Sequence, residues 1–287
     1  MNDVISSRPV SYTINGDGIQ LDIALVEINK LLLHEETIQK KVDELFAEIE
    51  RTGILKSPVI VGREFLVVLD GMHRVEVLKN MGCRFMCVCL VDYMSPRIKI
   101  DRWCRVVLSQ IPIEEIITDF GDLGVVTRTV SSASEGESLM LMLEEGYYKV
   151  TTHENGIISG FATVTNIESW LRRKGHAIRY ETERDATRML EQREAGFVLC
   201  PPAIQKKHVI EIAISGSVFP PKATRHIIPA RPFGIDVPIE LLKDKVISIA
   251  EANRQLSKLL ENKSIRRIPP GYRWGSRRYE EAIYLFK

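Results

Sequence analysis

Hydrophobic and polar positions near the start of the chain alternate first with strand-like and then with helical spacing. Residues 10–14 and 23–33 are rich in β-branched and aliphatic side chains, and the turn-forming run 15–18 (NGDG) separates them. This pattern predicts strands around a turn. From Glu36 onward, apolar residues recur at helical spacing until Gly53 supplies a stop, which predicts a helix.

The same alternation continues through the next forty residues. Two short apolar runs, at residues 58–61 and 65–69, predict strands, helical spacing follows at residues 75–81, and residues 84–91 predict another strand. The resulting order is strand, helix, strand, strand, helix, strand. This order is typical of an α+β fold with α/β layers around a mixed sheet.

The composition turns to Ser, Thr and Gly at residues 127–136, which marks a boundary between two domains. We place the domains at residues 1–128 and 129–287, and the second also has an α/β pattern. In this half, apolar runs predict strands at residues 147–151, 161–165, 198–200, 208–214 and 283–286, and helical periodicity predicts helices at 166–174, 183–195 and 246–260.

The overall charge is close to neutral, with 39 Lys and Arg against 38 Asp and Glu. The net charge of the chain therefore does not attract nucleic acid or an acidic membrane surface. Arginines among aromatic residues at 264–278 could bind RNA or DNA, but Glu280 and Glu281 follow at once, and we favour a structural tail. The chain has no apolar run of about 20 residues and no signal-peptide pattern at its N-terminus. We expect a cytoplasmic protein with neither a membrane nor a nucleic-acid partner, and the sequence indicates no oligomeric state.

The five cysteines form neither a CxxC pair nor a zinc-binding spacing. Cys83, Cys87 and Cys89 cluster around one predicted strand. We expect reduced cysteines in the core, and the sequence does not identify which residues would hold a metal ion.

Residues 69–74 (LDGMHR) join a predicted strand to a predicted helix. Gly71 lets the backbone approach a ligand closely, the N-terminus of a helix attracts anions, and His73 and Arg74 add donors suited to phosphate oxygens. Beside a phosphate, Asp70 can act as a metal ligand or a base. The alternative is an Asp that caps the helix, followed by two solvated basic residues.

Two further places carry candidate chemistry. Thr224, Arg225 and His226 place a hydroxyl, a guanidinium and an imidazole next to one another after two prolines, which suits a carboxylate or a phosphate. Taken alone, this triplet is better explained as a surface strand with alternating faces. Trp103 is a candidate wall of a small-molecule pocket, although a tryptophan is more often partly buried in packing.

Three separated motifs together resemble the free L-serine kinases of the ParB/sulfiredoxin superfamily. They are residues 33–35 (LHE), 69–74 (LDGMHR) and 224–226 (TRH), in the same order and at comparable spacing over roughly residues 33–242. The resemblance implies a ParB/sulfiredoxin-like N-terminal domain and a second α/β domain that completes the substrate site. It also implies phosphoryl transfer from ADP or ATP to the hydroxyl of a free amino acid, with L-serine favoured, to give O-phospho-L-serine.

The resemblance further implies a role for each motif residue. Glu35 would act as the general base, with Glu36 as an adjacent competitor, and Asp70 would be essential for catalysis. Mg²⁺ would accompany the nucleotide as a cofactor. The nucleotide phosphates would be bound by Gly71, Met72, His73 and Arg74, and the substrate by Trp103, Thr224, Arg225 and His226. Met72 departs from the residues common in the family at a position that varies there, so we expect its side chain to contribute little.

Two related activities compete with this interpretation. Sulfiredoxins carry a nucleophilic cysteine in the related motif, but Met72 stands there in this chain and offers no thiolate. ParB proteins use a different, arginine-rich motif followed by helix-turn-helix segments, and neither is clear in this sequence. A ParB-like nucleotide-binding protein associated with DNA, either non-enzymatic or nuclease-like, is the alternative function.

Overall fold

The computed structural model describes residues 9–131, 138–151, 156–274 and 277–287. The chain forms two compact units, one of residues 1–99, 210–218 and 226–287 and the other of residues 100–209 and 219–225. The boundary predicted between residues 128 and 129 therefore lies inside the second unit. A change in composition is a local feature, and it cannot show that later segments return to the first unit.

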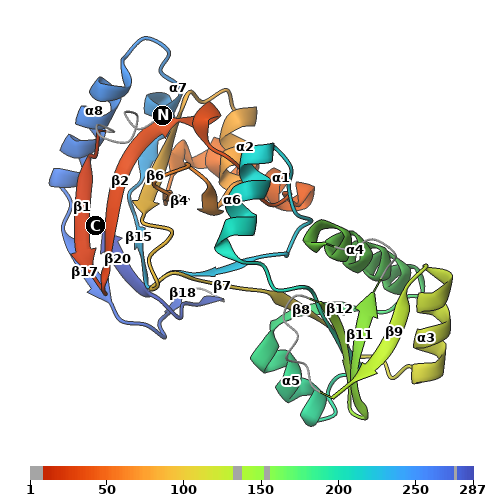
Figure 1. Ribbon diagram of the computed structural model, residues 1–287. Coiled ribbons are helices and arrows are strands. Elements are labelled where there is room, and N and C mark those ends of the chain that lie inside the picture. Colours follow the sequence, from red (N-terminus) through yellow and green to blue (C-terminus); the bar gives the residue numbers. More distant parts are fainter. Residues whose placement is uncertain (1–8, 132–137, 152–155, 275–276) are drawn as a thin grey trace. The chain divides into compact units, whose positions relative to one another are not determined.

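A five-stranded mixed sheet organises the first unit, in the order β1-β2-β6-β4-β5 (Figure 1). Its strands are β1 (Tyr12–Gly16), β2 (Ile19–Glu27), β4 (Val59–Gly62), β5 (Val68–Asp70) and β6 (Phe85–Val91). β4 and β6 run parallel, whereas the other neighbours are antiparallel. The predicted strands around residues 15–18 pair as a hairpin, and the expected mixed sheet is confirmed.

Helices cover this sheet. Helix α1 (Gln39–Thr52) ends at Gly53, whose φ of 65° lies in the left-handed region, and packs against α2 (Met72–Asn80). Helix α7 (Ile239–Lys243) packs against β6, and α8 (Ile249–Glu261) packs against β2 (Figure 1). The remaining elements are η1 (Ile28–Lys30), the pair β3 (Ile54–Leu55) and β16 (Val237–Pro238), the sheet of β15 (Ala230–Phe233), β20 (Ala282–Phe286) and β17 (Ile265–Ile268), and the pair β18 (Arg273–Trp274) and β19 (Arg277–Arg278).

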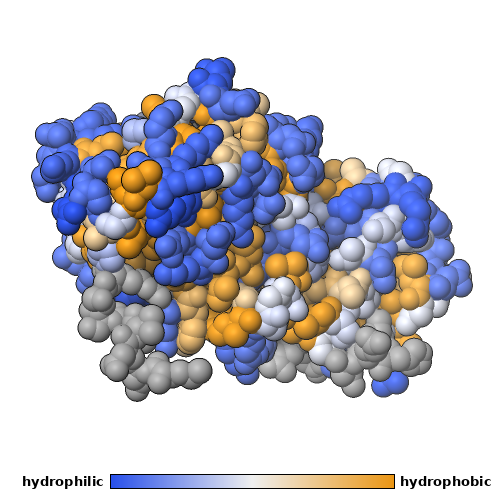
Figure 2. Space-filling model, turned by 90° about the horizontal axis from the view of Figure 1, so that it is seen from above, coloured by the Kyte–Doolittle hydropathy of each residue, from blue (hydrophilic) through white to orange (hydrophobic). Residues whose placement is uncertain are grey.

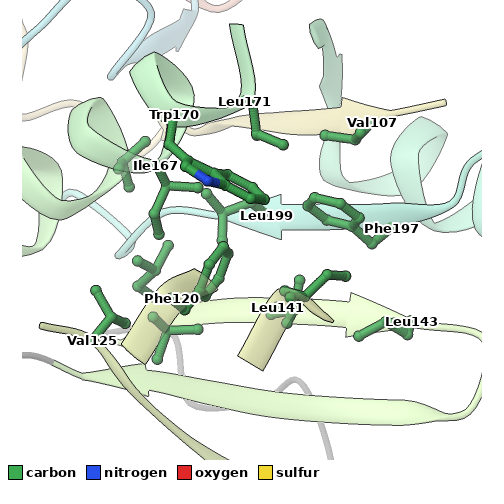
Figure 3. Close-up of a cluster of buried hydrophobic side chains, with 14 residues drawn as sticks. Val107, Phe120, Val125, Leu141, Leu143, Ile167, Trp170, Leu171, Phe197 and Leu199 are labelled. Carbon is green, nitrogen blue, oxygen red and sulfur yellow. The ribbon is translucent and has the colours of Figure 1, made fainter. Parts of the chain in front are cut away.

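The second unit is built on a six-stranded antiparallel sheet in the order β12-β8-β13-β10-β11-β9. Alternate residues of its central strands are buried on opposite faces, as the twofold repeat of a strand requires. On one face Val107, Leu141 and Leu199 pack with side chains of α3 and α4 (Figure 3). On the other, Val106 and Met142 pack with α5. The elements are β8 (Trp103–Val107), α3 (Ile113–Asp122), β9 (Val126–Val130), β10 (Leu139–Leu143), β11 (Gly146–Thr151), α4 (Ile157–Arg173), β12 (Ile178–Thr182), α5 (Glu183–Glu191) and β13 (Phe197–Cys200).

Two strand predictions in this half are wrong. Residues 161–165 lie within α4, and residues 208–214 lie within α6 (Lys206–Ser215). Both stretches are dense in β-branched or aromatic residues, which favours a strand locally. The longer burial pattern is helical, because Phe161, Val164 and Leu171 are all buried along one face of α4. The pair β7 (Lys99–Asp101) and β14 (Arg225–Ile227) completes the fold, and the chain passes between the units within each of these two strands.

The five cysteines are all free and buried, as expected. Burial raises the pKa of the Cys87 thiol to about 12, so it carries no thiolate at neutral pH. Among the helices that the structure describes, none is long and apolar enough to cross a membrane. Figure 2 shows hydrophilic side chains over much of one face of the molecule, with apolar side chains in smaller groups between them.

Asn253 connects α8 to the central sheet. Its Oδ1 atom accepts the N–H of Leu25 at 2.8 Å and its Nδ2 atom donates to the carbonyl of Leu25 at 3.0 Å, so the side-chain amide pairs with β2 as a neighbouring strand would. The hydroxyl of Ser11 also donates to Oδ1 at 2.7 Å. Because Asn253 is only 3% exposed, water cannot replace these bonds.

We predict that Asn253→Ala lowers the free energy of unfolding by about 2–4 kcal/mol, because it leaves the polar backbone of Leu25 buried without these partners. Urea unfolding followed by circular dichroism measures the change. Gln255→Ala, at an exposed position of the same helix, serves as the control and should stay within about 0.5 kcal/mol of wild type. Equal effects in the two variants would contradict the role assigned to Asn253.

Candidate functional site

The segments that carry Glu35 and Asp70 run in the same direction in the first unit. Leu32 and Val67 form a parallel bridge, and the N–H of Val68 donates to the carbonyl of Leu32 at 2.9 Å. Glu35 lies three residues beyond Leu32, and Asp70 lies three residues beyond Val67. The parallel pairing therefore directs both candidate carboxylates toward the same end of β5.

His34 anchors the loop that carries Glu35. Its side chain is fully buried, and its ring packs edge-on against the ring of His226 with centroids 5.3 Å apart. Burial lowers the pKa of His34 to about 4, although a hydrogen bond to the backbone of Val68 acts in the opposite direction. His34 is therefore neutral at neutral pH. His226, which we predicted to bind substrate, also forms a 2.9 Å hydrogen bond between its Nε2 atom and the hydroxyl of Tyr93.

The predicted turn between strand and helix is present at Gly71. β5 ends at Asp70 and α2 begins at Met72, so Gly71 occupies the N-cap position with a φ of 102°. A Cβ atom there would lie 2.6 Å from Cγ1 of Val59 and 2.7 Å from Nη2 of Arg74. Both the backbone conformation and the lack of space thus require glycine. Because Gly71 is the N-cap residue, Asp70 does not occupy the capping position that we considered as its alternative role.

His73 joins the motif to the start of α1. Its Nε2 atom accepts the backbone N–H of Ile38 at 3.0 Å, and Ile38 is the N-cap residue of α1. A ring nitrogen that accepts carries no proton, so the neutral ring holds its proton on Nδ1. His73 therefore fixes the end of the loop that begins at His34 and contains Glu35.

Two guanidinium groups converge on Asp70. Its Oδ2 atom lies 2.9 Å from Nη1 of Arg231 and 3.1 Å from Nη2 of Arg74. The Nε atom of Arg231 lies 2.5 Å from Oε1 of Glu281, which forms a second ion pair. Burial alone would lower the pKa of Arg231, but the carboxylates of Asp70 and Glu281 outweigh burial and hold the pKa above its ordinary value. Arg74 also donates to the carbonyls of two preceding loop residues, Ser57 at 3.0 Å and Pro58 at 2.5 Å.

A cavity of about 270 Å³ lies beside this charge cluster, lined by Asp70, Arg74 and Arg231 together with side chains of α1 and the loop after β3. A second cavity, of about 440 Å³, shares four lining residues with it. The shared residues are Lys56, Ser57, Phe233 and Tyr279. The rings of Phe233 and Tyr279 meet edge-on with centroids 5.3 Å apart. The two cavities thus combine a cationic end with an aromatic wall, which suits a phosphorylated compound that carries a ring.

The sequence did not predict the cavity-lining residues that lie far along the chain from the LDGMHR motif. Arg231 lies on β15, 161 residues beyond its partner Asp70, and Tyr279 lies near the C-terminus. Neither residue stands in a pattern that indicates a phosphate site. Arg231 does follow the TRH motif in a Pro/Arg-rich stretch, and this is the one signal that could have singled it out.

Trp103 and Arg225 come together in the second unit. The Arg225 guanidinium lies 5.6 Å from the centroid of the Trp103 ring, and its Nη1 atom lies 3.4 Å from Oδ2 of Asp101. Thr224, which directly precedes Arg225 in the chain, is buried. His226, by contrast, belongs to the first unit. Arg225 and His226 belong to β14 (Arg225–Ile227), which Thr224 precedes, and neighbouring side chains of a strand point in opposite directions.

A pH dependence of stability follows from buried His34. Its pKa is about 4 in the folded protein, whereas the ordinary value of 6.5 applies to the unfolded chain. The unfolded chain therefore takes up this proton first as the pH falls, and the stability that neutral His34 contributes is lost between pH 6.5 and 4, by about 3 kcal/mol in full. We predict that His34→Gln removes this part of the pH dependence. Urea unfolding from pH 7.5 to 4 measures it.

The control for this experiment is His208→Gln, at a half-buried position on α6, which should keep the wild-type slope. If His34→Gln also keeps the wild-type slope, His34 is not the neutral buried group described above.

No family model matches the chain. The chain is 28% identical over 235 residues to an ATP-dependent L-serine kinase of Staphylothermus marinus, which covers 76% of this chain and 90% of that protein. It is 24% identical over 233 residues to the ADP-dependent L-serine kinase SerK of Thermococcus kodakarensis, which covers 78% of this chain and 94% of the relative.

A solved structure of a free serine kinase in complex with AMP aligns with a TM-score of 0.67 at 23% identity, over 77% of this chain and 94% of that one. The expected fold class is thereby confirmed. The resemblance to the free L-serine kinases that the three motifs indicated is confirmed as well, and it extends over three quarters of the chain.

Proposed function

We propose that this protein is a kinase that transfers a phosphoryl group from ATP or ADP to the hydroxyl of a free amino acid, with L-serine favoured, to give O-phospho-L-serine. The observation that carries the proposal is the placement of Glu35 and Asp70 toward the same end of β5, where Asp70 lines a cavity together with Arg74 and Arg231. The relatives named L-serine kinases support this function over a ParB-like role on DNA.

The nucleotide would bind in the two neighbouring cavities of the first unit. Its phosphates belong at the cationic end, where Arg74 and Arg231 can neutralise charge and the N-terminus of α2 adds a favourable dipole. Gly71 allows the close backbone approach, and His73 and Met72 contribute through the first turn of the helix. The aromatic wall of Phe233 and Tyr279 is suited to the base.

Asp70 fits a role as the protein ligand of Mg²⁺. Within the described part of the chain, no three His, Cys, Asp or Glu side chains gather into a metal site. Mg²⁺ in kinases is commonly held by one or two carboxylates, by phosphate oxygens and by water, so a single carboxylate beside the phosphate site is sufficient. The ion would neutralise charge on the transferring phosphoryl group.

Glu35 would accept the proton of the substrate hydroxyl. A carboxylate suits this task because the transition state of phosphoryl transfer is loose and the proton leaves late. We assign the amino-acid carboxylate to Arg225 on Trp103, with Thr224 next to it. The contacts of His226 with His34 and Tyr93 favour a positioning role for this residue, which would act on the Glu35 loop.

The central test is a nucleotide-consumption assay across the free amino acids with ATP and with ADP. We expect consumption that depends on L-serine, with O-phospho-L-serine identified by mass spectrometry. Without any consumption dependent on an amino acid, the kinase function is wrong. DNA binding that weakens steeply between two salt concentrations would then favour the ParB-like alternative.

We predict that Asp70→Asn lowers turnover by on the order of 10³-fold, because it removes a charge at nearly constant volume where phosphate charge must be balanced. It should also cost some stability, since buried Arg231 loses one of its two carboxylate partners. Steady-state kinetics and urea unfolding measure the two effects separately.

Glu281→Gln is the matched control, because it makes the same chemical change at the other partner of Arg231. It should cost comparable stability but lower turnover by no more than about tenfold. If both variants lose activity in proportion to stability, Asp70 has only a structural role.

Glu35 and Glu36 provide a second test within one loop. Glu35 is half-buried, whereas Glu36 is exposed. We expect Glu35→Gln to lower kcat by about 10²–10⁴-fold and Glu36→Gln to change it less than about threefold, because only one of two adjacent side chains can face the hydroxyl. Initial rates at saturating serine and nucleotide give both values. The reverse order would show that the LHE motif is aligned one residue out of place.

A further inference from the structure

Tyr93 lies outside every motif of the sequence, two residues after the end of β6 in the first unit. It is buried, with 6% of the residue exposed. The backbone around it is fixed, because the N–H of Met94 donates to Oδ1 of Asp92 at 3.0 Å and the N–H of Ser95 donates to the carbonyl of Asp92 at 3.2 Å. The packing is close, since a Cβ atom at Gly62 would lie 3.2 Å from the Cβ atom of Tyr93.

Three rings of the first unit follow one another from Tyr93 to the residue that precedes Glu35. The centroids of the Tyr93 and His226 rings lie 5.4 Å apart with a tilt of 57° between the ring planes. The centroids of the His226 and His34 rings lie 5.3 Å apart with the rings edge-on. Close-packed side chains transmit displacements, so a shift of the first ring reaches the Glu35 loop.

The hydroxyl of Tyr93 adds a directional bond to this packing. It lies 2.9 Å from Nε2 of His226. Burial raises the pKa of this phenol above its ordinary value, so the hydroxyl keeps its proton at neutral pH. A protonated hydroxyl can donate to an imidazole nitrogen or accept from it, so the bond is compatible with either tautomer of His226. A phenylalanine at this position would keep the ring and lose the bond that fixes the rotation of the His226 ring.

The backbone on both sides of Glu35 is held by hydrogen bonds. The N–H of Val68 donates to the carbonyl of Leu32, three residues before Glu35, and the N–H of Ile38, three residues after it, donates to His73. With both ends held, only small shifts of the loop are possible, and neighbouring side chains can decide among them. Shifts of about 1 Å are enough to slow a positioned reaction on the order of 10²-fold.

A second buried tyrosine in the same unit shows that a hydroxyl bond alone does not indicate a role in the reaction. Tyr284 is 8% exposed, and its hydroxyl donates to Oδ2 of Asp17 at 2.8 Å. Asp17 is also paired with Arg267, so this bond joins β20 to the turn between β1 and β2. Tyr93 differs because the bond from its hydroxyl leads to the rings beside the Glu35 loop.

We propose that Tyr93 is a positioning residue for the reaction, which holds His226 against His34 and thereby sets the place of Glu35. The proposal rests on the kinase function above and adds to it a residue that belongs to none of its motifs. A general base must lie within hydrogen-bond reach of the hydroxyl that it deprotonates, so a displaced loop slows the chemical step. The nucleotide cavities lie at the other end of β5, and nucleotide binding should be little affected.

Hydrogen exchange and steady-state kinetics test the proposal in Tyr93→Phe, with Tyr284→Phe as the matched control. Each variant keeps its ring and loses one buried hydroxyl. We expect Tyr93→Phe to speed amide exchange in residues 33–38 by about fivefold and to lower kcat by about tenfold, with KM for the nucleotide within about twofold of wild type. Tyr284→Phe should change none of these values. In a Glu35→Gln background, Tyr93→Phe should not lower kcat further, because the group that it positions is gone.

Unchanged exchange of residues 33–38 in Tyr93→Phe overturns the proposal. Faster exchange with an unchanged kcat overturns it too, and so does a loss of kcat that persists in the Glu35→Gln background. An equal loss of kcat in Tyr284→Phe would show a general effect of destabilisation instead of positioning. A wild-type protein that consumes no nucleotide with any amino acid contradicts the kinase function, and the exchange data then still decide whether Tyr93 holds the loop.

Discussion

The buried guanidinium of Arg231 is the constraint on which the first unit's site depends. A cation that is only 7% exposed has to be paired, and its partners are Glu281 and Asp70. Through these contacts the small sheet of β15 and β20 is connected to the end of β5, where the LDGMHR motif begins. The carboxylate that pairs with the cation is also the one proposed for the chemistry. The full set of contacts at Asp70 therefore depends on segments far apart in the chain, because Arg231 is itself paired with Glu281 near the C-terminus.

Two neutral histidines, His34 and His73, fix the loop that carries Glu35. His73 accepts a backbone hydrogen bond through Nε2, and His34 is buried with a pKa of about 4. Both roles require an uncharged ring at the position concerned. The loop between them carries Glu35, and its two ends are fixed by contacts that carry no net charge. The proposed general base, Glu35, is therefore carried by a loop whose two supports add no net charge beside it.

Local features of this fold could be predicted from the sequence, and long-range ones could not. The hairpin at residues 15–18 and the turn at Gly71 follow from turn chemistry within a few residues, because glycine alone accepts a φ of 102° against the side chain of Val59. Residues 161–165 have strand-like composition but belong to a helix, since tertiary packing on one face of α4 overrides local preference. The pairing of Arg231 with Asp70 spans 161 residues and leaves no trace in either local pattern.

The TRH motif shows why three residues that are adjacent in sequence need not form one site. The chain passes from the second unit to the first between Arg225 and His226, within β14. Successive side chains of a strand point in opposite directions. Arg225 accordingly lies on Trp103 among residues of the second unit, and His226 lies against His34 and Tyr93 in the first. One peptide bond thus joins a residue suited to hold substrate to a residue suited to position the base. Under the proposed function, a change at Arg225 would affect substrate binding and a change at His226 would affect the position of Glu35, so the two positions have to be interpreted separately.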